Sequence, residues 1–142
     1  MTIAAILSGK GHEVVSITAD RTVSEAVQLL AARRIGAVPV MGGDAVLGIF
    51  SERDVIHGLE REGAGALDRR VSEVMTTPAI TVAPGESILG ALALMTQRRI
   101  RHLPVIDGGK CVGMVSIGDL VKHRIDRIES EAEAMRSYIQ SA

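Results

Sequence analysis

Apolar positions along the chain follow two spacings, and the order of the spacings occurs twice. Short apolar runs are typical of strands, whereas apolar residues at every third or fourth position indicate one face of a helix. In the first half, an apolar run at 13–17 precedes a helical pattern at 23–30, and strand-like runs follow at 37–41 and 45–50. A second helix is expected from Glu52. The predicted order is strand, helix, strand, strand, helix.

The second half repeats this order. Residues 14–56 align without a gap on residues 65 positions later, so that RRIGAVPV falls on RRIRHLPV and GIFSERD (48–54) falls on GMVSIGD (113–119). The corresponding first strand is expected at 79–82, and the last helix is expected to begin at Ile117. Matches at this many ungapped positions indicate a duplicated structural unit.

Both units carry helix-start and turn signals at equivalent positions. Thr22 and Ser87 precede the first helix of each unit, and short hydroxyl side chains there accept hydrogen bonds from free backbone N–H groups. Glycine-bearing turns at 42–44 and 107–109 predict that the two following strands form a hairpin. The apolar helix faces are expected at Val23, Ala26, Val27 and Leu30, and at Ile88, Ala91, Leu92 and Met95.

A unit of this size buries little apolar surface when it stands alone. We therefore expect two tandem β-α-β-β-α units, packed sheet to sheet around a pseudo-twofold axis, in an α+β fold. The first unit is predicted at 8–65 and the second at 66–128, and residues 129–142 extend the last helix.

Composition narrows the function classes. The 142 residues include one phenylalanine, one tyrosine and no tryptophan, and the formal net charge is -1. Few aromatic side chains and no basic excess argue against nucleic-acid binding. Cys111 is the only cysteine, which excludes an internal disulfide and favours a core thiol. The N-terminal apolar patch is too short for a membrane span and lacks a leader pattern, so a cytoplasmic, soluble protein is expected.

With these motifs, almost the whole chain resembles tandem CBS domains, the regulatory module of IMP dehydrogenases, AMP-activated protein kinase and chloride channels. The segments VSEVMTTPAITV (71–82) and RHLPVID (101–107) belong to the resemblance as well. No catalytic domain accompanies the pair, so the chain is similar to the free-standing bacterial CBS-pair proteins.

The repeated Ser-x-x-Asp motif has two interpretations. Ser51 with Asp54, and Ser116 with Asp119, have the spacing of a helix capping box. The same helix start offers free N–H groups to a phosphate, and an aspartate one turn later can accept the vicinal hydroxyls of a ribose. The resemblance implies the second role: both aspartates bind ribose, and both serines contact ribose or phosphate.

The adenine base of such a ligand requires a binding surface separate from the Ser-x-x-Asp motif. Proline offers no N–H group and holds the preceding residue extended, which leaves backbone groups free for a ligand edge. These positions are Gly36, Ala37 and Val38 in the first unit, and Arg101, His102 and Leu103 in the second. The resemblance places the other wall of the cleft at Ser16, Ile17, Thr81 and Val82. The alternative for each of them is an ordinary strand residue that contacts no ligand.

Cationic side chains differ between the two candidate sites. Arg53 stands where the second motif has Gly118, while Arg101 and His102 replace Gly36 and Ala37. Lys10 is a further candidate for a phosphate contact. The alternative for each of these cations is an ordinary solvated surface side chain that contacts no ligand. We therefore expect two sites of unequal affinity, or for different ligands.

Catalytic motifs are absent from the sequence: it contains no P-loop, GxGxxG, HExxH or nucleophile elbow, and its four histidines lack metal-ligand spacing. The prediction is a regulatory module, not an enzyme, that binds AMP, ADP, ATP, NAD(H) or S-adenosylmethionine and holds no metal. A ligand-independent dimeric scaffold is the alternative, and a nucleotide-hydrolysing enzyme is a third hypothesis. No residue names the regulated partner protein.

The C-terminal helix carries an apolar seam of alternating four- and three-residue steps, typical of a coiled coil. Its members are Val121, Ile125, Ile128, Ala132, Met135 and Ile139. A helix lying on its own domain explains the first half of the seam. The second half extends past the repeat and predicts a partner, most simply a second copy of the chain.

Overall fold

The computed structural model describes residues 1–141. The first unit contains β1 (Ile17–Thr18), α2 (Val23–Arg33), β2 (Ala37–Gly42), β3 (Ala45–Ser51) and α3 (Glu52–Glu62). The second contains α5 (Ile88–Arg98), β4 (His102–Asp107), β5 (Lys110–Ser116) and α6 (Ile117–Ser141). The remaining helices are α1 (Ile3–Lys10), η1 (Gly63–Asp68) and α4 (Val71–Val74). The predicted α+β fold of two tandem units is confirmed.

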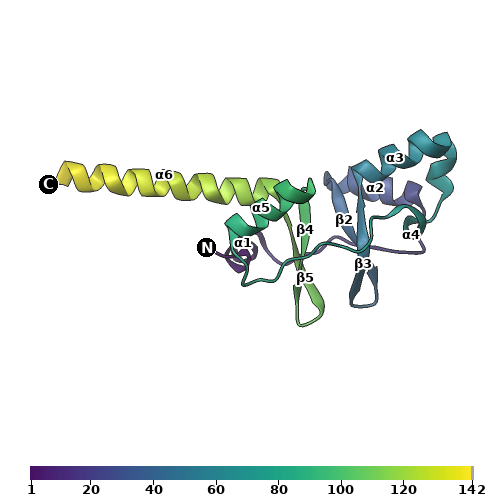
Figure 1. Cartoon of the computed structure of the whole chain (residues 1–142), viewed down its shortest axis with the longest axis horizontal. Coiled ribbons are helices and arrows are strands. Elements are labelled where there is room, and N and C mark those ends of the chain that lie inside the picture. The colour runs from purple at the N-terminus through teal and green to yellow at the C-terminus, as the bar shows by residue number, and fades with distance from the viewer. Residues whose placement is uncertain (142) are drawn as a thin grey trace.

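The two units lie side by side, and their hairpins β2–β3 and β4–β5 extend in the same direction (Figure 1). Strands β3 and β5 contact each other between the units. Helix α6 continues well past the second unit as a single projecting rod (Figure 1). Within residues 1–141, no helix combines the length and the apolar character needed to cross a membrane.

The first strand of each unit is shorter than its apolar run predicts. Strand β1 pairs with β2 only at Ile17 and Thr18, and in the second unit Val82 forms a single parallel bridge to Val105. The partner strand has a proline immediately before its first paired residue, Pro39 in β2 and Pro104 in β4. Because proline has no N–H group, the ladder ends there, and the backbone upstream of each short strand stays unpaired.

The predicted helix starts and helix faces are confirmed. Thr22 Oγ1 accepts a hydrogen bond from the Glu25 N–H at 3.1 Å, and Ser87 Oγ accepts one from Gly90 N–H at 2.9 Å. The helix residues buried in the two cores are Val23, Ala26 and Leu30 in α2, and Ile88, Ala91 and Met95 in α5.

Helix α1 is the element that the sequence analysis missed, and it completes the core of the second unit. Ile3, Ile6 and Leu7 are buried with the apolar residues of α5, β4 and β5. Val71 of α4 completes the first core in the same way. Each unit is therefore closed by the helix that precedes the other unit in the chain.

The glycine of the repeated motif makes this packing possible. A Cβ atom on Gly48 would lie 2.7 Å from the Thr76 carbonyl oxygen, and one on Gly113 would lie 2.6 Å from Leu7 Cδ2. Both distances are shorter than real Cβ contacts allow. The motif needs glycine because the segment from the other unit crosses directly over the strand.

Candidate functional site

A cavity of about 360 Å³ lies where the first unit meets the segment that enters the second. One wall comes from the starts of β2 and α3, and includes Gly36, Ala37, Ser51 and Arg53. The rest of the wall comes from residues 76, 78–80 and 99–102. Apolar surface predominates in the cavity, provided chiefly by Ile49, Ile56, Pro78, Ala79, Ile80 and Ile100.

Asp54 is held at the edge of this cavity by two of its wall residues. The Ser51 backbone N–H donates to Asp54 Oδ2 at 2.9 Å, and the Thr76 hydroxyl donates to Asp54 Oδ1 at 2.9 Å. The carboxylate is half-buried. It therefore closes a capping interaction at the start of α3 and also joins α3 to the inter-unit segment.

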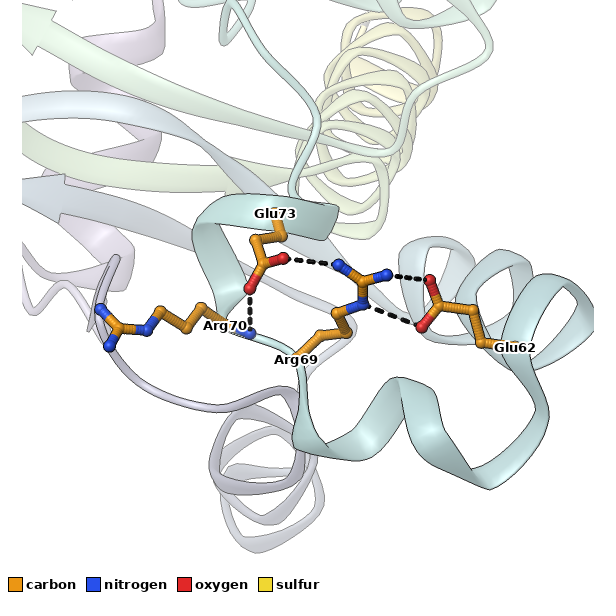
Figure 2. Close-up of polar contacts among 4 residues, drawn as sticks. All are labelled: Glu62, Arg69, Arg70 and Glu73. Carbon is orange, nitrogen blue, oxygen red and sulfur yellow. Dashed lines mark hydrogen bonds and ion pairs between the residues drawn. The ribbon is translucent and has the colours of Figure 1, made fainter.

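Thr76 is positioned by backbone pairing and by a nearby ion-pair cluster. Thr76 forms two backbone hydrogen bonds with Ile49, at 2.8 and 3.0 Å. Just upstream, Arg69 binds Glu62 through two hydrogen bonds of 2.9 and 2.6 Å and binds Glu73 at 2.6 Å (Figure 2). These hydrogen bonds raise the pKa of Arg69 above its ordinary value. The cluster joins the end of α3 to α4, which leads directly into Thr76.

Asp119 has different surroundings. The Ser116 N–H donates to Asp119 Oδ2 at 2.8 Å, as in the first motif, but Lys10 Nζ also donates to this oxygen at 2.7 Å. Lys10 Nζ reaches the Met114 carbonyl oxygen at 2.8 Å as well. Partial burial raises the pKa of Asp119, but the hydrogen bonds from Lys10 and Ser116 and the charge of Lys10 outweigh this effect and leave the pKa below its ordinary value.

His102 lies in the wall of the cavity and near the second motif. Burial lowers the pKa of His102 below its ordinary value, although the nearby carboxylates of Glu52 and Asp119 oppose this effect. The imidazole also approaches Gly36, where a Cβ atom would lie 3.3 Å from His102 Cε1. A bulky side chain stands here where the first unit has Ala37.

The structure brings together six of the residues that the sequence analysis selected. Gly36, Ala37, Ser51, Arg53, Arg101 and His102 line the cavity. The side chains of Val38, Val82 and Leu103 belong to the cores, so only their backbone atoms remain for a ligand.

Six other selected residues lie away from the cavity wall. Ser16 and Ile17 border a separate depression beside α2, and Thr81 is exposed. Lys10 and Ser116 lie with Asp119 at the second motif.

Several wall residues were not selected from the sequence. They are Ile49, Glu52, Ile56, Thr76, Pro78, Ala79, Ile80, Arg99 and Ile100. No sequence signal marks residues 78–80, because the unpaired backbone before Val82 depends on the register with β4. Arg99 does carry a sequence signal, since it immediately precedes the extended segment that leads to Pro104.

Comparison with known proteins identifies the family. A model of the CBS domain matches residues 11–61 and 71–126. The chain belongs to the CBS-domain family. A mitochondrial CBS domain-containing protein of Arabidopsis thaliana is 36% identical to it, with 98% of this chain and 72% of the relative aligned. A CBS-domain protein of Agrobacterium tumefaciens is 38% identical in sequence, with a TM-score of 0.84 over 87% of this chain and 92% of the other.

Two more distant CBS structures contain adenosine ligands. A CBS domain protein of Pyrobaculum aerophilum is complexed with AMP, at 24% identity and a TM-score of 0.75 over 84% of this chain and 89% of the other. The CBS domain pair of protein MJ0100 is in complex with 5′-methylthioadenosine and S-adenosyl-L-methionine, at 20% identity and a TM-score of 0.79, over 89% of this chain and 98% of the other. At these identities the likeness to the present chain is one of fold.

Proposed function

We propose that this CBS pair is a regulatory module that binds an adenosine nucleotide in the cavity beside Asp54. The observation that carries the proposal is the cavity itself, which combines an apolar interior, a half-buried carboxylate at its edge and cationic side chains in its wall. The AMP-bound relative supports this ligand class.

The cavity has a suitable place for each part of a nucleoside. Ile56, Ile80 and Ile100 offer aliphatic surface for the base, since the cavity wall contains no phenylalanine, tyrosine or tryptophan. The unpaired backbone at residues 79 and 80 can hydrogen-bond with the edge of the base. A ribose has two adjacent hydroxyl donors, and the Asp54 carboxylate has about four acceptor positions. The Ser51 N–H, the Ser51 hydroxyl and the Thr76 hydroxyl occupy three of them. One position is therefore free, and rotation of the Ser51 hydroxyl would free a second.

Native mass spectrometry tests this function. We expect the full chain, purified and then mixed with ATP, to gain the mass of one nucleotide per chain at low concentration. A chain that binds no adenosine nucleotide would contradict the proposal. ATP converted to ADP or AMP in the same sample would instead point to an enzyme.

We also propose that the protein is a homodimer and that α6 contributes to its interface. The seam residues Ile128, Met135 and Ile139 are 49%, 59% and 64% exposed, which is unusual for large apolar side chains aligned on one helix. A second copy would cover them by pairing its own α6. The regulated protein would then recognise a shape set by two chains.

Truncation after Arg127 should weaken this dimer. Each large apolar side chain contributes roughly 1.5–3 kcal/mol when buried, so loss of these three should raise the dimer dissociation constant at least about 100-fold. Sedimentation velocity measures the change. Met135→Gln should weaken the dimer in the full chain, while Arg136→Gln, on an exposed neighbour outside the seam, should not. An undiminished dimer after truncation would show that the seam has another purpose.

A further inference from the structure

Three arginines in the cavity wall have no partner among residues 1–141. Arg53, Arg99 and Arg101 line the cavity, and none of their guanidinium groups forms an ion pair or hydrogen bond with the described chain. Five other arginines do form ion pairs: Arg21, Arg33, Arg69, Arg127 and Arg136. Three of the eight arginines that form no ion pair within residues 1–141 therefore lie in the wall where a ligand would bind.

Arg99 caps the C-terminal end of α5 in the left-handed region, with φ 55°. Its counterpart in the first unit, Arg34, has the same φ at the end of α2 but does not line the cavity. The conformation therefore belongs to the repeated helix end, and Arg99 differs from Arg34 by its position in the cavity wall.

The arginines come from both units. Arg53 stands in the first turn of α3, near the N-terminal end where the helix dipole favours anions, whereas Arg99 and Arg101 precede β4. The carboxylate of Glu52 also lines the cavity and offsets one of the three positive charges. The cavity wall therefore carries an excess of positive charge contributed across the boundary between the units.

The charge of this wall suits a polyphosphate better than a monophosphate. A guanidinium group has five N–H donors and binds two oxygens at a time in its fork geometry. Three such groups, contributed by both units, can bind oxygens of successive phosphates. Each additional phosphate also brings more negative charge to the same positive wall.

We propose that the cavity selects adenosine di- and triphosphates over AMP, and over uncharged or cationic adenosyl compounds such as 5′-methylthioadenosine and S-adenosylmethionine. This inference rests on the proposed function, because it names the ligand class of the same site. The positive wall attracts the phosphate chain and repels a sulfonium group. Binding of the polyphosphate would also connect the two units through their arginines.

Isothermal titration calorimetry of the full chain with ATP, ADP, AMP and S-adenosylmethionine, in buffer without divalent cations, tests the selectivity. We expect ATP to bind at least about tenfold more tightly than AMP, and S-adenosylmethionine more weakly than AMP. Raising the salt concentration from about 50 to about 300 mM should reduce the ATP/AMP ratio, because exposed charges are screened.

Arginine variants separate charge at the cavity from charge elsewhere. Arg99→Gln and Arg101→Gln should each lower ATP affinity about three- to tenfold and change AMP affinity less. Arg98→Gln removes the same charge from an adjacent residue outside the cavity wall and should leave the ATP/AMP ratio unchanged. Equal affinities for AMP and ATP would overturn this inference while supporting the proposed function. Absence of binding by every adenosine compound would overturn both.

Discussion

Asp54→Asn should lower the affinity for an adenosine nucleotide about 10- to 100-fold, because charge-assisted hydrogen bonds to two ribose hydroxyls contribute roughly 1.5–3 kcal/mol. An asparagine side chain offers only one acceptor oxygen. That oxygen can still accept from the Ser51 N–H, and its amide can donate to the Thr76 hydroxyl. The unliganded protein should therefore melt near the wild-type temperature but lose the rise in melting temperature that ATP gives.

Asp119→Asn is the matched control for this experiment. It makes the same change at the equivalent repeat position. Asp54 is bonded to Ser51 and Thr76 of the cavity wall, whereas Asp119 is bonded to Lys10 and Ser116, which lie outside it. We expect it to leave most of the ATP-induced rise intact, as a consequence of unequal sites. If Asp54→Asn also preserves the full rise, the first aspartate is only a helix cap, and the scaffold hypothesis gains support.

Leu7→Ala should lower the free energy of unfolding by about 2–5 kcal/mol, the usual range for truncating a buried leucine. Leu7 is 1% exposed and lies in the core of the second unit, directly over Gly113. Urea denaturation followed by circular dichroism measures the loss. Ser8→Ala, at the exposed next position of α1, should change stability little. A loss below about 1 kcal/mol for Leu7→Ala would show that α1 is not needed to close the second core.

The repeat made most of the fold predictable from the sequence. Periodicity located α2, α5 and the two hairpins, and the capping residues Thr22 and Ser87 marked the helix starts. Helix α1 lies before the repeated segment, so the alignment of the two units does not reach it. Its apolar residues Ile3, Ile6 and Leu7 do have helical spacing, which was the signal that could have found it.

The first strands were overestimated for a different reason. An apolar run predicts burial, and Val15 and Ile80 are indeed packed against the two cores. Pairing depends on the partner strand, where Pro39 and Pro104 remove a donor. The consequence of these prolines for the neighbouring strand depends on register, which only the structure provides.

The candidate site was predictable in part. Six wall residues could be predicted because they lie within or next to the proline and Ser-x-x-Asp motifs, which are recognisable in the sequence. The wall formed by Thr76, Pro78 and Ile80 comes from the inter-unit segment, and its position depends on tertiary packing over Gly48. The sequence predicts that the two sites differ. It does not reveal the pairing of Lys10 with Asp119 as one cause of the difference, because these residues are 109 positions apart.

A crystal structure of the full chain grown in saturating ATP tests the central claim most directly. We predict one nucleotide in the cavity, with its ribose hydroxyls within hydrogen-bonding distance of the Asp54 carboxylate and its phosphates at Arg53, Arg99 and Arg101. A nucleotide bound elsewhere, or an empty cavity at saturating ATP, would contradict the account.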